Sequence, residues 1–337
     1  MTERILTEGF LETAKSQGES AQPVVRDYLM GLTASALSEV YNGEARQNEA
    51  VPVLIGGIAL KKGYLIDFPR FTTDIDYSTQ RTFFEGRGSL DADYYGDRMQ
   101  DAASIVREKV KKVYGSKAMS PNGIIMDVER RLIRGGPLAT LRTHIKFPRF
   151  LKYDDLKIKV ETNATRTEDG ALPPRVLPLL HRYGDAAELD MGTLTVEDIR
   201  KIHSDKLFAL MNRLSDENDM AKTSRMKDIF DIWYISQFYQ NDRLPELFDA
   251  RVQRETKRGA NIDEIEKTMQ RILQDGDQFL KWLEEVIRKN VPGLDGKSTD
   301  EVVKRMVLGL PKKYNFPPAK VLVENLVMEL QRVYPIR

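Results

Sequence analysis

The stretch VLIGGIALKKGYLIDFPRFTTDIDYS, residues 53–78, contains the pattern that decides the fold. The apolar run 51–55 leads directly into Gly56 and Gly57, which is typical of a buried strand that enters a tight turn. A helix is expected over 58–62, immediately behind the turn. Because glycine has no side chain, the backbone of such a turn can approach an anion closely, and the N-terminus of the following helix points its N–H groups at the same place.

The second half of the stretch predicts another strand, over 71–77, that carries two aspartates. Asp74 and Asp76 are two residues apart, so on a strand both carboxylates face the same side. Carboxylates held this close repel each other unless a cation or water compensates their charge. The pair therefore predicts a divalent-metal site, and Glu161, in a later predicted strand, is the candidate for a third ligand.

Nucleotidyl transfer requires backbone amides that hold phosphate oxygens, carboxylates that hold metal ions, and a cation that steadies the leaving pyrophosphate. The glycine turn and the two aspartates are candidates for the first two parts. Each piece also has an ordinary structural explanation, because Gly-Gly is often only a turn and Asp-x-Asp is often an exposed strand end. Their combination within one short stretch favours the transferase.

Composition narrows the class of protein. The 337 residues are 41% hydrophobic, and no apolar run reaches the roughly 18 residues that a membrane span needs. The N-terminal residues mix acidic and basic side chains and lack the apolar core of a secretory signal, so a cytoplasmic protein is expected. There is no cysteine, and the three histidines, His144, His181 and His203, are scattered. A metal site must then rest on carboxylates, which favours Mg²⁺ or Mn²⁺ over zinc.

The charge of the chain is balanced, with 52 basic and 51 acidic side chains and a net charge of +1. The net charge of the protein is therefore too small to attract nucleic acid by itself, although a local basic surface can coexist with a nearly neutral net charge. Basic runs at 109–112, 130–134 and 251–258 are candidates for an RNA-binding face. Runs of this kind are more often simply solvated surface.

Apolar periodicity and breaks at glycine and proline predict the remaining elements. In chain order they are one or two helices in 1–48, a helix over 96–114, strands over 124–132, 138–147 and 156–163, and helices from 196 to the end.

The stretch 53–78 resembles the opening motif of the AbiEii/AbiGii toxins, MenT-like nucleotidyltransferases of abortive-infection and type IV toxin–antitoxin systems. That motif consists of Gly-Gly or Gly-Ser, a helix, and an Arg-x-Ser/Thr-x-Asp-x-Asp run. Arg70, Thr72, Asp74 and Asp76 fit the run. The sequence departs from the pattern at 63–69, which reads as an insertion before the run.

A second resemblance lies downstream, in EDIRKIHSDKLFALMNRL (197–214) and RMKDIFDIWYIS (225–236). These segments are similar to the family's Lys-Leu-x-Ala-Leu-x-x-Arg and Lys/Arg-Asp-x-x-Asp elements. The matching residues are Lys206, Leu207, Ala209, Leu210, Arg213, Asp228 and Asp231. The part of the chain after about Asn241 has no match, which leaves the choice of substrate undecided.

The resemblance implies an α+β fold, in which the mixed-sheet core of DNA polymerase β-like nucleotidyltransferases is followed by a helical domain. We expect the core and the N-terminal helices in 1–175 and the helical domain, which completes the active-site cleft, in 176–337. The implied catalytic residues are Asp74, Asp76, Lys206 and Asp228, the implied nucleotide- and phosphate-binding residues are Gly56, Gly57, Arg70, Thr72 and Arg213, and the implied metal ligands are Asp74, Asp76 and Glu161.

The resemblance also implies roles for the downstream residues, if the helices there fold back across the cleft. Lys206 is expected to place its positive charge on the triphosphate, and Asp228 to orient Lys206 or the acceptor hydroxyl. Arg213 lies seven residues after Lys206, two turns along nearly the same helix face, and is expected to contact phosphate or RNA. The ordinary alternative is an ion pair between two helices.

The implied activity is transfer of a nucleoside monophosphate from a nucleoside triphosphate to an RNA acceptor, the 3′ end of tRNA, which would block translation. Mg²⁺ or Mn²⁺ is the expected cofactor, and an antitoxin from an adjacent gene is the expected partner. Two alternatives stay open. The acceptor could be a hydroxyl of a protein or of a small molecule such as an aminoglycoside, or the chain could be a non-catalytic module that sequesters a partner.

Overall fold

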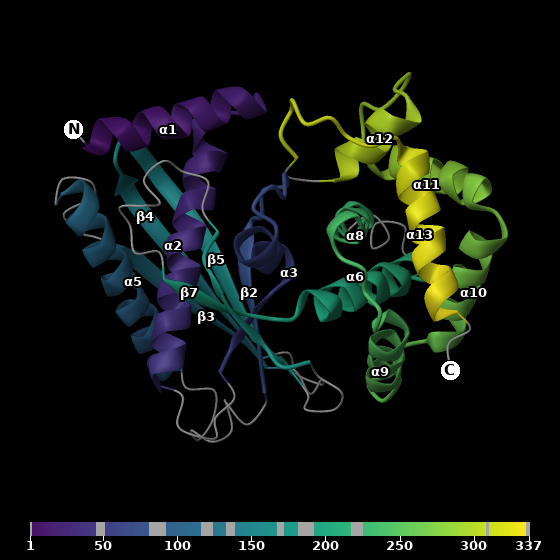
Figure 1. The fold of residues 1–337 in the computed structure, drawn as a ribbon, viewed down its shortest axis with the longest axis horizontal. Coiled ribbons are helices and arrows are strands. Elements are labelled where there is room, and N and C mark those ends of the chain that lie inside the picture. Colours follow the sequence, from purple (N-terminus) through teal and green to yellow (C-terminus); the bar gives the residue numbers. More distant parts are fainter. Residues whose placement is uncertain are drawn as a thin grey trace. The chain divides into compact units, whose positions relative to one another are not determined.

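The protein divides into two compact units, which are described one at a time (Figure 1). The computed structural model describes residues 2–44, 51–80, 92–115, 124–132, 139–166, 172–180, 192–216, 225–307 and 310–334. Unit 1 consists of Met1–Glu168, Pro173–Glu197 and Pro311–Lys313, and unit 2 of Asp169–Leu172, Asp198–Leu310 and Tyr314–Arg337.

Unit 1 is built on a mixed sheet with the strand order β3-β4-β5-β2-β1-β7-β6. The strands are β1 (Val53–Ile55), β2 (Asp74–Gln80), β3 (Ile125–Leu132), β4 (Ala139–Phe150), β5 (Tyr153–Arg166), β6 (Arg175–Pro178) and β7 (Thr193–Val196). The pairs β2–β5 and β1–β7 are parallel, whereas the other neighbouring strands are antiparallel. This mixed sheet with its helices confirms the expected α+β class.

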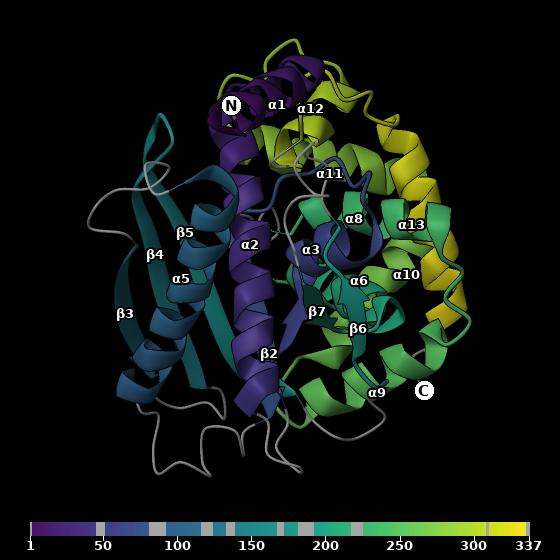
Figure 2. The same cartoon turned by 60° about the vertical axis from the view of Figure 1, so that its left-hand side comes forward.

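One face of the sheet is covered by the helices α2 (Ala21–Glu44) and α5 (Ala92–Tyr114), which lie side by side in Figures 1 and 2. Strand alternation provides the apolar surface beneath them, because Ile158 and Val160 on β5 are fully buried. The ring of Tyr28 on α2 stacks on Phe150 of β4 with 5.9 Å between the centroids. The opposite face of these strands is consequently left for polar side chains.

The helix behind the glycine turn begins at the turn itself. Helix α3 (Gly56–Ala59) continues directly into a short π-helix, η1 (Leu60–Tyr64). Two lysines of η1, Lys61 and Lys62, are buried and pair with Asp27 of α2 at 3.2 Å and 2.6 Å between nitrogen and oxygen. Since a buried charge is costly unless it is paired, these contacts fix η1 against α2 and hold the turn in place.

Most predicted elements of unit 1 are confirmed, with shifted ends. The two helices expected before residue 48 are α1 (Thr2–Gln17) and α2, and β3, β4 and β5 lie where strands are expected. The strand expected over 71–77 begins only at Asp74. Strands β6 and β7 were not predicted, and their pairing with the sheet extends unit 1 to Glu197. A boundary at 175/176 between independently folding domains stays a prediction.

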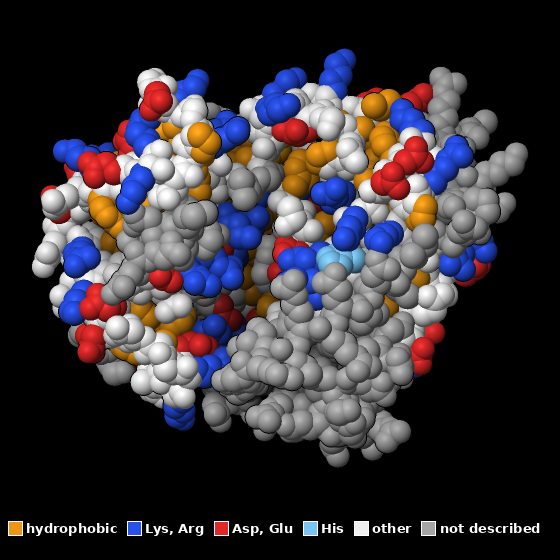
Figure 3. All heavy atoms as spheres, turned by 180° about the vertical axis from the view of Figure 1, so that it is seen from behind, with side chains coloured by type: hydrophobic (Ala, Val, Ile, Leu, Met, Phe, Trp, Pro, Cys, Tyr) orange, Lys and Arg blue, Asp and Glu red, His pale blue; other side chains and the backbone are white. Residues whose placement is uncertain are grey.

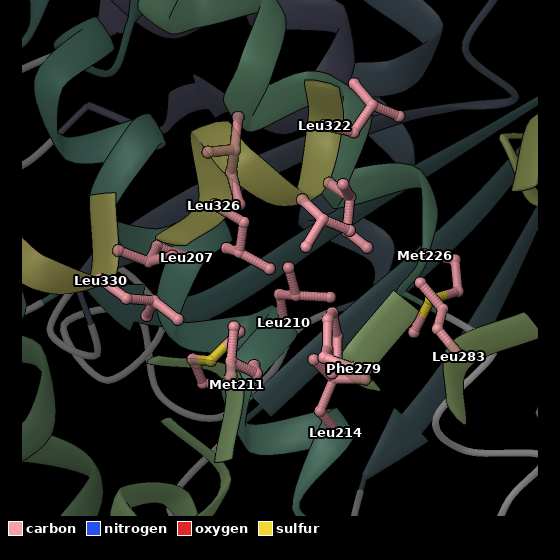
Figure 4. Close-up of a cluster of buried hydrophobic side chains, with 14 of the residues drawn as sticks. Leu207, Leu210, Met211, Leu214, Met226, Phe279, Leu283, Leu322, Leu326 and Leu330 are labelled. Atoms are coloured by element: carbon pink, nitrogen blue, oxygen red, sulfur yellow. The ribbon is translucent and has the colours of Figure 1, made fainter. Parts of the chain in front are cut away.

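Unit 2 is helical throughout its described residues from Asp198 on. Its helices are α6 (Ile199–Leu214), α8 (Lys227–Phe238), α9 (Leu244–Thr256), α10 (Ile262–Gln274), α11 (Gly276–Asn290), α12 (Thr299–Met306) and α13 (Ala319–Val333). Leucine, methionine and phenylalanine side chains from α6, α11 and α13 meet Met226, which directly precedes α8, in one apolar core (Figure 4). Side-chain caps stop fraying of the shorter helices, and α12 starts with a full capping box between Ser298 and Glu301.

No helix in the described part of the chain combines the length and the hydropathy that crossing a bilayer requires.

Candidate active site

Three carboxylates from two neighbouring strands converge on the polar face of the sheet. Asp74 and Asp76 open β2, and Glu161 lies on β5 in direct register with Asp76. One oxygen from each of the three lies within 4.8 Å of the others, and all three side chains are partly exposed. The spacing suits a divalent ion that takes oxygen ligands. The structure thus brings together the three metal ligands that the sequence predicts.

The glycine turn lies directly beside this carboxylate cluster. Gly56 has φ +72°, in the region that glycine adopts without strain, and Asp76 Oδ2 is 3.5 Å from the position that a Cβ of Gly56 would occupy. A Cβ on Gly57 would lie 2.8 Å from both Arg70 Nη2 and Thr72 Cγ2. A larger residue at Gly57 would have to displace Arg70 or Thr72, because the backbone of the turn packs closely against these side chains.

Arg70 and Thr72 are therefore held at the turn, as the motif predicts, but both are buried. Arg70 is 4% exposed and lies over the ring of Phe68, and Thr72 is 7% exposed. The Thr72 hydroxyl donates a long hydrogen bond of 4.0 Å to Met30 Sδ on α2, while its methyl group faces Gly57. Both residues thus support the shape of the turn, and their proposed contacts with phosphate remain a prediction.

Two cations accompany the three carboxylates. Lys159 Nζ lies 2.7 Å from Asp74 Oδ2 and 3.5 Å from Glu161 Oε2. On the other side, Arg142 of β4 donates from Nε to Glu161 Oε1 at 2.6 Å and pairs with the same oxygen through Nη2. Glu161, a predicted metal ligand, therefore contacts two basic residues.

The electrostatics of Lys159 follow from these contacts. Partial burial lowers the pKa of its ammonium group, but the hydrogen bond and the charge of Asp74, together with the charges of Glu161 and Asp76, outweigh this effect and leave the pKa raised. Lys159 therefore carries its positive charge throughout the neutral pH range.

Sequence reasoning missed Lys159 and Arg142, and the pattern contained a signal for Lys159 alone. Lys159 is two residues before Glu161 on β5, so alternation places both side chains on one face. The contact of Arg142 with Glu161 depends on the pairing of β4 with β5, which places the two residues directly opposite each other. A register between strands cannot be read from either strand alone.

The downstream motif forms a separate buried cluster within unit 2. Lys206 of α6 lies between two aspartates of α8, with Nζ 2.7 Å from Asp228 Oδ1 and 2.6 Å from Asp231 Oδ2. The lysine side chain is 10% exposed, and those of the aspartates are 1% and 0% exposed. Arg225 Nη1 adds a further contact with Asp228 Oδ2 at 3.6 Å. These contacts join α6 to α8.

Two other residues of α6 differ from this cluster. Arg213 is 45% exposed and pairs with Asp216 at 3.6 Å, at the C-terminal end of the helix. His203 is fully buried, and desolvation, followed by the nearby charge of Arg332, lowers its pKa to about 4. At neutral pH His203 is therefore an uncharged part of the helical core.

The comparison with family models agrees with the motifs and the geometry. The model of the nucleotidyl transferase AbiEii toxin of type IV toxin–antitoxin systems matches residues 44–304. The chain belongs to this AbiEii family of nucleotidyltransferase toxins. The match includes the glycine turn, the carboxylate cluster and the whole of the Lys206 cluster.

Solved structures that match this chain over nearly its whole length have little sequence in common with it. MenT4, a nucleotidyltransferase toxin from Mycobacterium tuberculosis, is 16% identical, with 98% of this chain and 99% of that chain covered and a TM-score of 0.49. JHP933 from Helicobacter pylori is 15% identical, with 93% and 94% covered and a TM-score of 0.44. No curated protein sequence matches the chain. The family assignment comes from the match along the sequence.

Proposed function

We propose that this nucleotidyltransferase toxin transfers a nucleoside monophosphate from a nucleoside triphosphate to the 3′ end of a tRNA in the cytoplasm, with the help of Mg²⁺ or Mn²⁺. The observation that carries this proposal is the cluster of Asp74, Asp76 and Glu161 beside the Gly56-Gly57 turn. An antitoxin from a neighbouring gene is the partner that the family leads us to expect.

The site contains the parts that bind a metal–triphosphate complex. Asp74, Asp76 and Glu161 are assigned to the ion, and their purely oxygen donors favour Mg²⁺ or Mn²⁺. When bound, such an ion supplies charge neutralisation for the phosphates and orients the reacting oxygens. Gly56 and Gly57 are partly exposed and have no side chains, which supports an approach of phosphate oxygens to their backbone, and Arg70 behind the turn adds positive charge.

The proposed reaction is a single displacement at phosphorus. The oxygen of the acceptor hydroxyl bonds to the α-phosphorus, the bond from this phosphorus to the β-bridging oxygen breaks, and pyrophosphate leaves. The hydroxyl proton passes to a carboxylate oxygen of the site, and the position of Asp76 on β2, beside the glycine turn, supports its choice as the proton acceptor.

The charge of the β4–β5 hairpin supports RNA as the acceptor. Between Arg142 and Glu161 the hairpin contains six Lys and Arg and three Asp and Glu, a net charge of +3, whereas the whole chain has +1. On the part of the surface that unit 1 forms, lysine and arginine side chains gather beside a histidine (Figure 3). Lys157 and Lys159 share the strand face of Glu161, so a phosphate backbone laid along the strands would lead to the metal ligands.

Further proposed roles concern unit 2. Lys206 and Arg213 are proposed to contact phosphate groups, and Asp228 to orient Lys206. Support comes from the family motif and from the buried pairing of Lys206 with Asp228.

The test is incubation of the purified protein with each of the four labelled triphosphates, in turn with tRNA, total protein or an aminoglycoside. We expect label on tRNA, sensitive to EDTA, and a loss of roughly 100-fold or more in rate for Asp76→Asn, because this change removes a ligand charge. Asp154→Asn, an exposed position on the same hairpin, serves as the matched control and is expected to keep the rate.

Each alternative has its own outcome in this assay. Label on protein or aminoglycoside but not on RNA would replace the acceptor and keep the enzyme. No label anywhere, with growth inhibition that persists in the Asp76→Asn variant, would show a sequestering module instead.

A further inference from the structure

The side chain of Lys159 lies within the carboxylate cluster itself. Its Nζ atom is 2.7 Å from Asp74 Oδ2 and 3.5 Å from Glu161 Oε2, which are two of the three proposed ligand residues. An ammonium group at this position contacts carboxylates that would also hold a divalent ion. It is 30% exposed, so solvent and solutes can reach it.

The strand pairing explains why Lys159 reaches the cluster while its neighbour does not. Lys159 stands directly opposite Asp74 in the parallel pair of β5 and β2. Lys157 points to the same face of β5, two residues earlier and before β2 begins, and is exposed. Lys157 and Lys159 thus lie on the same face of one strand, and of these two lysines Lys159 is the one that contacts the carboxylates.

Lys159 contributes to the balance of negative and positive charge in the cluster. Three carboxylates close together repel one another, and this repulsion would push Asp74 and Glu161 apart if no cation were present. Lys159 and Arg142 together supply two positive charges against three negative ones.

A metal ion and Lys159 compete for Asp74 Oδ2, because their positive charges repel each other at short range. Mg²⁺ binds carboxylate oxygens at about 2.1 Å, so an ammonium group hydrogen-bonded to the same oxygen would be forced close to a divalent charge. The ammonium group has to leave when the ion arrives, and its long, flexible side chain permits this.

We propose that Lys159 is a built-in counter-ion, a positioning residue that holds Asp74 and Glu161 together before the metal binds and competes with the metal for them. The proposal rests on the proposed metal site. It predicts that the protein without nucleotide binds its ion more weakly than the carboxylates alone would. A triphosphate brings oxygens that can accept the displaced ammonium group, so metal and nucleotide are expected to bind more tightly together than separately.

The experiment compares Lys159→Met with Lys157→Met, since each removes one lysine charge from the same face of the same strand. Mn²⁺ binding is measured by calorimetry and by the spectroscopic signal of free Mn²⁺, without nucleotide. We expect the Kd of Lys159→Met to fall about fivefold, the size of one partly exposed ion pair. For Lys157→Met, a more distant and screened charge, the change should stay below about twofold. Without Mn²⁺, the melting temperature of Lys159→Met should lie below that of Lys157→Met.

The Mn²⁺ measurements distinguish a failure of the counter-ion proposal from a failure of the proposed metal site. If the wild type binds Mn²⁺ and Lys159→Met binds it equally or more weakly, Lys159 is a metal-site support and the counter-ion proposal is wrong. If neither the wild type nor either lysine variant binds Mn²⁺, the proposed metal site fails instead. Circular dichroism checks the fold, and Lys159→Gln takes the place of the methionine variant if that variant does not fold.

Discussion

At the scale of single residues, Gly57 shows how closely the phosphate-binding turn is packed. A Cβ there would lie 2.8 Å from Arg70 Nη2 and from Thr72 Cγ2, closer than carbon atoms come to such neighbours. Gly57→Ala should therefore displace Arg70 and lower the free energy of unfolding by about 1–3 kcal/mol, the usual cost of overpacking. Nucleotide transfer should fall with it, because the turn is proposed to receive the phosphates. Urea unfolding and the transfer assay measure the two effects.

Gly9→Ala is the matched control, since Gly9 lies inside α1 and a Cβ there would meet no atom within 4 Å. Alanine is the better helix former, so this variant should be slightly more stable, by roughly 0.5–1 kcal/mol. Equal stability of the two variants would mean that Arg70 and Thr72 yield to the extra methyl group without cost, and that the turn is not tightly packed.

At the scale of elements, the cluster of Lys206, Asp228 and Asp231 joins α6 to α8. Lys206→Met removes the ammonium group that both buried carboxylates contact, and we expect it to cost about 3–5 kcal/mol of unfolding free energy. The triple variant with Asp228→Asn and Asp231→Asn removes those charges as well and should recover most of the loss. Chemical unfolding of the wild type and both variants makes the comparison.

The activity of the triple variant then separates two roles of Lys206. A folded triple variant without transferase activity would support a catalytic role for the pair of Lys206 and Asp228 beyond the joining of the two helices. Full activity in a folded triple variant would reduce the cluster to an ion pair between helices, the ordinary alternative for this motif.

Elements with a long, regular pattern were predictable, and short ones were not. Helix α5 and strands β4 and β5 have enough residues for their periodicity to be read. Strands β6 and β7 have four residues each, too few for a period, and β7 is fixed by a distant partner, with Val196 beside Leu54. Tertiary pairing, not local preference, makes a strand of such a segment.

At the scale of the whole molecule, charge is distributed unevenly along a nearly neutral chain. The positive charge of the hairpin from Arg142 to Glu161 should attract the phosphates of the proposed RNA acceptor. RNA binding should therefore weaken as the salt concentration rises. The double variant Lys152→Ala/Lys157→Ala should weaken tRNA binding and reduce the slope of log Kd against log salt by about 1–2, roughly one per lost phosphate contact. Fluorescence anisotropy over a salt series measures both quantities.

The control is Lys267→Ala/Lys297→Ala, two lysines of unit 2 with 57% and 52% exposed side chains, which removes the same total charge. An equal loss of binding in both double variants would point to net charge and not to the hairpin. Unchanged binding in the hairpin variant would place the RNA elsewhere.

The sequence by itself determined the class of fold, the family, and the shared strand face of Asp74 and Asp76, because strand alternation and motif spacing are local properties. It offered Glu161 only as a candidate, and the pairing of β5 with β2 brings Glu161 beside the two aspartates. Only the tertiary structure decided which cations accompany them. Lys159 and Arg142 reach the carboxylates through the pairing of β5 with β2 and with β4, and those registers depend on packing between segments far apart in the chain. A cluster of charges is fixed by distances of a few ångströms, which no single segment specifies.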